Sequence, residues 1–133
     1  MLSAKSTLIA GAIFGFLSVA LGAFGAHALK VYLLETNRLD TYEKAVQYQM
    51  YHALALLFVG ILGLQFPELK LDWVGLLFVL GILIFSGSLY VLCGTGIRWM
   101  GAITPLGGIC FLVGWGMLAW KVWNGLDIIK LNP

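Results

Sequence analysis

The chain has 133 residues, of which 61% are hydrophobic, while only 8 are basic and 6 acidic, for a net charge of +2. A soluble domain carries about 25% charged residues, and one membrane-spanning helix needs about 20 apolar residues. The composition gives about 81 apolar residues (61% of 133) and therefore predicts four spans in one integral membrane domain, residues 1–133. It leaves no room for a separate soluble domain, and the scattered Lys and Arg residues argue against nucleic-acid binding.

The first apolar run predicts a helix over residues 7–29. The run contains Ser and Thr but no charged residue. A cleaved signal peptide is the alternative, because Lys5 precedes the run and small residues close it. The run has the length of a span rather than the ~7–15 residues of a signal-peptide core, so we expect a retained helix.

A polar connection over residues 30–41 separates the first two helices, and its first half has the pattern of an interfacial segment. Asp40 is expected to cap the second helix, with Glu43 as the acid of a capping box. That helix is predicted over residues 41–64, and Pro67 follows its end.

The third helix is predicted over residues 73–93, before the Gly-Thr-Gly break at 94–96, and the fourth over residues 98–123. The fourth begins near Arg98 and kinks at Pro105, or it begins at Pro105 with Thr104 as its cap. A short tail that holds Asp127 and Lys130 follows. We expect an all-α membrane protein, a four-transmembrane-helix bundle with both termini on the same side. Four of the five tryptophans lie near predicted ends; Trp115 is the exception and packs inside the bundle or against lipid tails.

Lys and Arg, which set membrane orientation, divide evenly between the two sides of this topology. Lys5, Lys70, Lys121 and Lys130 lie on one side, and Lys30, Arg38, Lys44 and Arg98 on the other. The tie leaves the orientation open. A fixed topology is favoured over dual insertion with an antiparallel dimer.

Small residues form two helix-packing seams, since close backbone approach drives helix association in lipid. The first helix has one continuous seam at intervals of three and four, formed by Gly11, Gly15, Ser18, Gly22 and Gly25. A shorter seam in the fourth helix is formed by Gly107, Cys110 and Gly114. Packing within one chain is favoured for at least one seam, and a homo-oligomer remains open for the other.

Uncharged polar residues gather toward one end of the predicted bundle. Polar side chains at membrane depth are functional-site hypotheses by default. The expected cluster is formed by His27, Gln47, Gln49, Tyr51, His52, Ser86, Ser88 and Tyr90. Gln49 and His52 share a helix face, as do Ser86 and Tyr90.

This cluster has three interpretations. The favoured one is structural, with hydrogen bonds that join the helices at about 0.6 kcal/mol each. The second is a small-solute or ion permease with a polar pathway near His27 and His52. The third, least favoured, is haem held by two histidines, because His52 lies about two turns deeper than His27.

No catalytic constellation or metal-ligand pattern stands out in the sequence. The acidic residues fall in predicted loops, helix ends or the tail, which argues against a two-carboxylate enzyme. Cys93 and Cys110 form neither a disulfide framework nor a zinc pattern. We therefore expect no enzyme activity, no cofactor and no metal.

Four motifs in order resemble a known family over nearly the whole chain. They are GAFGAHAL (22–29), AVQYQMYHALAL (45–56), FSGSLY (85–90) and GAITPLGG (101–108). They resemble domain-of-unknown-function family 423, which includes small bacterial membrane proteins and animal transmembrane protein 256. The resemblance implies a four-helix integral membrane protein and implies no activity.

The sequence thus predicts a multi-pass protein, and the lack of an Arg-rich, acid-poor presequence favours a bacterial plasma membrane. Its expected partners are the lipid bilayer and a second copy or an unidentified membrane partner. The leading hypothesis is a structural or partner-binding role within the membrane.

Overall fold

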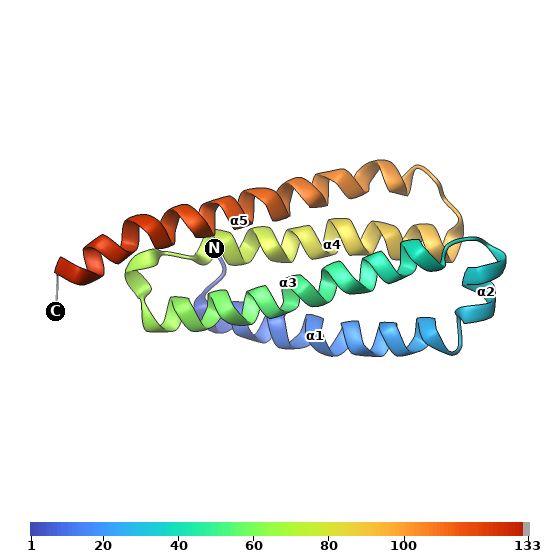
Figure 1. Cartoon of the computed structure of the whole chain (residues 1–133), viewed down its shortest axis with the longest axis horizontal. Coiled ribbons are helices and arrows are strands. Elements are labelled where there is room, and N and C mark those ends of the chain that lie inside the picture. Colours follow the sequence, from blue (N-terminus) through green and yellow to red (C-terminus); the bar gives the residue numbers. More distant parts are fainter. Residues whose placement is uncertain (132–133) are drawn as a thin grey trace.

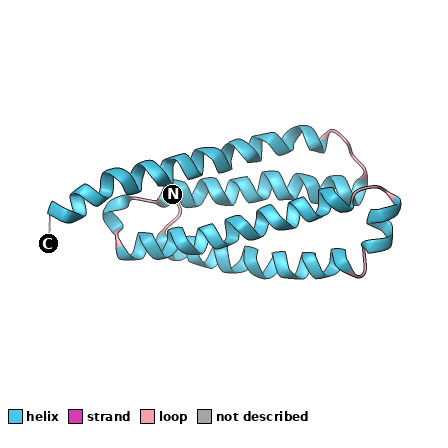
Figure 2. Cartoon of the chain, viewed as in Figure 1, coloured by secondary structure: helices cyan, strands magenta, loops and turns pink. Residues whose placement is uncertain are grey.

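Four long helices alternate in direction along the chain in the computed structural model, which describes residues 1–131 and the side chains of residues 1–125. The elements are α1 (Ala4–Ala26), α2 (Lys30–Glu35), α3 (Leu39–Gln65), the 3-10 turn η1 (Pro67–Leu69), α4 (Asp72–Thr95) and α5 (Met100–Leu131). α1, α3, α4 and the Met100–Gly125 part of α5 are each long and apolar enough to cross a membrane. The predicted bundle with four apolar helices is confirmed. Figure 2 shows that helices and the loops between them make up the described chain.

The two inner helices of the bundle are α3 and α4, with α1 and α5 on the flanks (Figure 1). α1 packs mainly on α3, α5 packs mainly on α4, and α3 and α4 pack on each other. α1 meets α4 over a small contact, where Thr7 lies against Gly75. Both flanking helices therefore keep broad outward faces: Phe16 of α1 and Leu112 of α5 are each 74% exposed.

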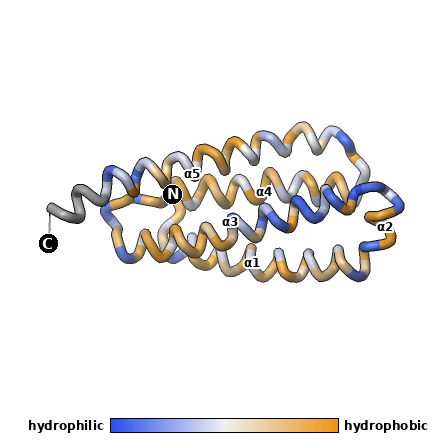
Figure 3. Tube along the Cα trace, in the orientation of Figure 1, coloured by the Kyte–Doolittle hydropathy of each residue, from blue (hydrophilic) through white to orange (hydrophobic). Residues whose placement is uncertain are grey.

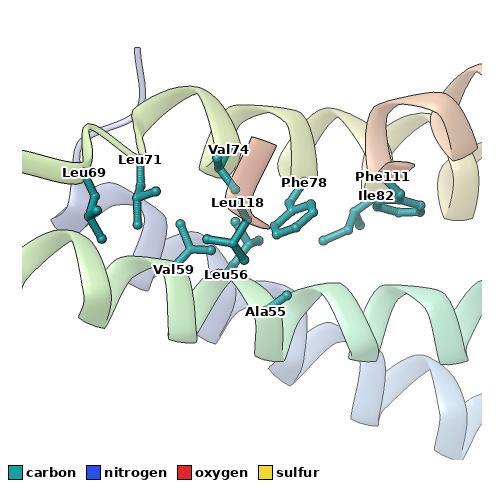
Figure 4. Packing of buried hydrophobic residues seen from close by; sticks show 10 residues of the cluster. All are labelled: Ala55, Leu56, Val59, Leu69, Leu71, Val74, Phe78, Ile82, Phe111 and Leu118. Atoms are coloured by element: carbon teal, nitrogen blue, oxygen red, sulfur yellow. The ribbon is translucent and has the colours of Figure 1, made fainter. Parts of the chain in front are cut away.

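The hydrophobic core lies between α3, α4 and α5 (Figure 4). Phe78 and Leu56 are fully buried, and Phe111 and Leu118 of α5 close over them. A second, smaller cluster at the α2 end contains Leu33, Tyr42 and Cys93. Polar side chains lie in the bundle interior between these two clusters.

The first helix begins and ends three residues earlier than the predicted range of 7–29. Ser3 caps it, because its Oγ accepts a hydrogen bond from the Ser6 N–H at 3.2 Å. After His27 the chain turns, with the Leu29 N–H donating to the Phe24 carbonyl at 2.9 Å. The turn allows α2 to fold back and bury Leu33.

The predicted capping box at the start of the second long helix is wrong. α3 begins at Leu39 with Arg38 at the N-cap, and no side chain caps it. Asn37 adopts a left-handed conformation (φ 52°), and the Arg38 N–H donates to the Leu33 carbonyl at 2.8 Å. α2 thus ends in a Schellman motif, and α3 begins at the residue after this motif. Asp40 therefore lies in the first turn of α3 and not at the N-cap position before the helix.

The fourth long helix differs most from its predicted range of 98–123. α5 begins at Met100 and continues through Pro105, so the alternative in which Thr104 caps the helix is wrong. Proline is tolerated in a membrane helix when neighbouring groups satisfy the freed backbone. α5 also extends to Leu131, because no proline interrupts residues 124–131. The side chains of Asp127 and Lys130 lie outside the described residues.

Candidate functional site

Gln49 lies at the centre of the bundle and joins three helices. Its Nε2 donates to the Phe14 carbonyl of α1 at 3.0 Å, and its Oε1 accepts from the Tyr90 hydroxyl of α4 at 2.8 Å. The side chain is 3% exposed. One residue of α3 therefore hydrogen-bonds to the helices on both sides of it.

His52, one helical turn further along α3, uses both of its ring nitrogens. Nδ1 lies 2.7 Å from the Tyr48 carbonyl, and the Trp115 indole N–H donates to Nε2 at 3.1 Å. A carbonyl only accepts and an indole only donates, so the ring must be neutral with its proton on Nδ1. The imidazole also stacks on Phe111, with ring centroids 3.5 Å apart and planes 10° apart.

Serine hydroxyls make further hydrogen bonds between the helices. Ser86 donates to the Ala45 carbonyl at 2.7 Å, which ties α4 to α3, and Ser88 bonds Thr104 of α5 at 2.7 Å. On the other side of α3, Ser18 of α1 donates to the Val46 carbonyl at 2.9 Å. Each of the three main helix pairs (α1 with α3, α3 with α4, and α4 with α5) is thus joined by at least one side-chain hydrogen bond.

We call the buried and half-buried residues of this network the polar ladder: Ser18, Gln49, His52, Ser86, Ser88 and Tyr90 with their partners Thr104 and Trp115. Within the described side chains, no buried nitrogen or oxygen lacks a hydrogen-bond partner. Thr7 bonds the Ser3 carbonyl of its own segment, whereas the residues of the polar ladder hold one helix against another.

The structure brings five of the predicted cluster residues into this ladder and leaves three outside it. His27 is exposed at the C-cap of α1, and Gln47 and Tyr51 are exposed on α3. A bis-histidine haem would need His27 and His52 to face one iron. His27 lies on the surface, whereas both nitrogens of His52 are engaged inside, so the side chains present do not fit that group.

The small-residue seam of α1 faces α3 within the same chain. A Cβ added at Gly11 would lie 2.9 Å from the Ala53 carbonyl oxygen, and one at Gly25 would overlap the Tyr42 ring. A Cβ at Gly22 would lie 3.4 Å from Val46. The seam of α5 faces α4, since Gly107 packs against the Phe85 backbone. Packing within one chain, the favoured interpretation, therefore applies to both seams.

Sequence reasoning missed Tyr42 as an inward-facing residue and did not connect Trp115 with the polar cluster. Tyr42 donates to the Leu21 carbonyl at 2.7 Å and so adds a further bond between α3 and α1. The spacing Tyr42, Ala45, Gln49, His52 alternates intervals of three and four, which places all of them on one helix face. The sequence left open whether Trp115 packs inside the bundle or against lipid tails. It does both, because its indole bonds His52 while the side chain remains 46% exposed.

Arg38, also missed, caps the C-terminal end of α4 from the α2–α3 junction. Its guanidinium donates to the Cys93 carbonyl at 3.2 Å, and the Tyr32 hydroxyl donates to the same carbonyl at 3.1 Å. A cation at a helix C-terminus is favoured by the helix dipole and by the free carbonyls of the last turn. Arg38 therefore fixes α2 to α4 at this end of the bundle.

We expect Arg38→Gln to lower the free energy of unfolding by about 1–2 kcal/mol, because the half-buried guanidinium bonds are lost. Denaturant titration in detergent micelles, followed by circular dichroism, measures the change. Arg98→Gln is the matched control, since that side chain is exposed at the same end. Equal losses in both variants would show that the cap contributes nothing.

Two hollows in the surface are lined by none of the polar-ladder residues. One of about 290 Å³ lies beside Ser3, Thr7 and Lys70, where α1 begins and α4 follows η1. Another of about 230 Å³ lies between the end of α1 and the start of α3. The residues that the structure describes contain no group of three or more side chains able to hold a metal ion.

Comparison with known proteins identifies a family and several bacterial membrane proteins that this chain resembles. Residues 21–108 match the model of a protein family of unknown function, DUF423. A UPF0382 membrane protein of Staphylococcus saprophyticus is 49% identical over 114 residues, which cover 86% of this chain and 93% of the relative. The UPF0382 membrane protein YwdK of Bacillus subtilis is 44% identical over 115 residues, with 86% and 93% covered. No solved structure matches the chain.

Proposed function

The chain belongs to the DUF423 family of UPF0382 membrane proteins, and from that premise we propose that it acts as a non-enzymatic helical scaffold that binds a partner within the bilayer. It is a small multi-pass membrane protein whose family has no assigned role. The proposal is therefore drawn from how the chain uses its own polar groups.

One observation carries this proposal: the polar groups inside the bundle already form hydrogen bonds with other groups of the same chain. Gln49 and His52, the groups best suited to guide a solute, each bond two partners inside the chain. A permeation pathway needs polar groups that exchange partners with the solute. The interior of this bundle instead supports a rigid body with two outward apolar faces, on α1 and α5.

Flux measurements on the purified chain in liposomes test the proposal. We expect proton leak, followed with an entrapped pH dye under a clamped potential, to equal that of protein-free liposomes. Glycerol swelling rates should also be equal. His52→Ala and His27→Ala should leave both rates unchanged, because His27 is exposed and both ring nitrogens of His52 are bonded within the chain.

A flux above the protein-free level that His52→Ala abolishes would overturn the proposal and support a permease. His27→Ala serves as the control in that comparison, since its side chain is exposed and outside the ladder. Crosslinking of the wild-type chain in its native membrane gives the positive readout, namely a reproducible partner band that depends on the outward face of α1 or α5.

A further inference from the structure

The end of the bundle that carries α2 has a two-part hollow beside the start of α3. The larger part, about 230 Å³, has a floor of small residues from α1 (Gly22, Gly25 and Ala26). The smaller part, about 190 Å³, is lined by Asp40, Glu43, Lys44 and Gln47. Glu43 and Gln47 line both parts, so the two hollows adjoin at these side chains, and we call them together the groove, with an apolar floor and a charged rim.

The length of α3 places this groove in the lipid headgroup layer. Its 27 residues span about 40 Å at 1.5 Å per residue, whereas the hydrocarbon core is about 30 Å thick. α3 ends at Gln65, and the polar residues Glu68 and Lys70 follow, so the excess of about seven residues lies at its beginning. Figure 3 shows that this beginning of α3 is its hydrophilic part.

The rim residues of this groove are free to bind a ligand. Within the described side chains, no hydrogen bond or ion pair involves Glu43 or Gln47, in contrast to the residues of the polar ladder. The rim holds two carboxylates, Asp40 and Glu43, and one ammonium group, on Lys44. Such a rim favours a ligand with a positive group next to a negative one.

We infer that this groove is a binding site for the headgroup of an ethanolamine phospholipid. The primary ammonium group of the lipid donates to Glu43 and Asp40, and its phosphate accepts from Lys44. The Gln47 amide bonds the oxygens near the glycerol, and the first acyl carbons lie on Gly22 and Ala26. Each part of the groove, about 230 and 190 Å³, is smaller than the ~300–1,000 Å³ of pockets that enclose a drug-sized ligand, so the groove holds the headgroup and leaves the acyl chains on the outer face of α1. This inference does not depend on the scaffold role.

Lipid retention by the full chain tests the site. We would reconstitute the protein in nanodiscs with equal amounts of phosphatidylethanolamine, phosphatidylglycerol and phosphatidylcholine and count retained lipids by native mass spectrometry. Phosphatidylethanolamine should be enriched over its bulk share. Glu43→Gln should reduce that enrichment about two- to fivefold, the effect of losing one exposed ion pair. Glu35→Gln, at an exposed acid of α2, should not.

A second pair of variants tests the shape of the groove. Ala26→Phe fills the floor and should abolish the enrichment, whereas Ala23→Phe, one turn earlier on an exposed position, should preserve it. Soluble glycerophosphoethanolamine should compete with the retained lipid, because the headgroup carries the recognition. Thermal unfolding of each variant separates loss of the site from loss of the fold.

Three results would overturn the inference. The first is retention of lipids in their bulk ratio by the wild-type chain, and the second is enrichment of phosphatidylglycerol. The third is a shift from dimer to monomer on Glu43→Gln with no change in lipid retention, which would mean that a second copy occupies the groove.

Discussion

Gly107→Ala is expected to lower the free energy of unfolding by about 3 kcal/mol, at the upper end for overpacking by a single methyl group. The added Cβ would lie 2.8 Å from the Phe85 Cα and closer still to its backbone nitrogen. A backbone cannot rotate away as a side chain does, so α5 must separate from α4. That movement also strains the Ser88–Thr104 hydrogen bond one turn away.

The neighbouring glycine provides the control for this prediction. A Cβ at Gly108 would meet nothing within 4 Å, so Gly108→Ala should be neutral or stabilise the helix by about 0.5–1 kcal/mol. Denaturant titration in micelles measures both variants. Similar values for the two would mean that the α4–α5 contact is looser than the structure indicates.

His52→Ala is expected to lower the free energy of unfolding by about 3 kcal/mol, because it opens a cavity and removes a hydrogen-bond acceptor. The ring is 5% exposed and stacks on Phe111, so the space it leaves is not filled by lipid. The indole N–H of Trp115 loses its acceptor at the same time. Tyr51→Ala, next to it but 58% exposed, should change the free energy by less than about 1 kcal/mol.

A double-mutant cycle isolates the hydrogen bond between His52 and Trp115. Trp115→Phe alone should lower the free energy of unfolding by about 1–2 kcal/mol, since it leaves a buried acceptor unpaired. The double variant should lose about 1 kcal/mol less than the sum of the single variants. Strict additivity would show that the indole and the imidazole do not interact.

The number and approximate position of the long helices follow from local properties of the sequence. A span is about 20 consecutive apolar residues, so the runs in α1, α3 and α4 are visible without any tertiary information. Helix ends are less visible, because they depend on single contacts. The left-handed Asn37 and the Ser3 cap moved two boundaries, and the continuation through Pro105 moved a third.

The polar site was predicted only by residue type, because spacing shows which residues share a face and not which face is buried. Gln49 and His52 were named correctly as neighbours, and their partners Phe14 and Trp115 lie on other helices. Tyr51 and Gln47 are polar like Gln49 and His52, but their side chains are exposed on the surface of α3.

The sequence by itself determined that this protein is a four-span membrane protein with small-residue seams and a polar level in its interior, because composition and periodicity are local properties. The tertiary structure decided what those features contact. The seams pack within one chain, and the interior polar groups bond one another. Glu43 and Gln47, which make no hydrogen bond with another described side chain, lie at the α2 end, where α3 extends about seven residues beyond the length that crosses the hydrocarbon core.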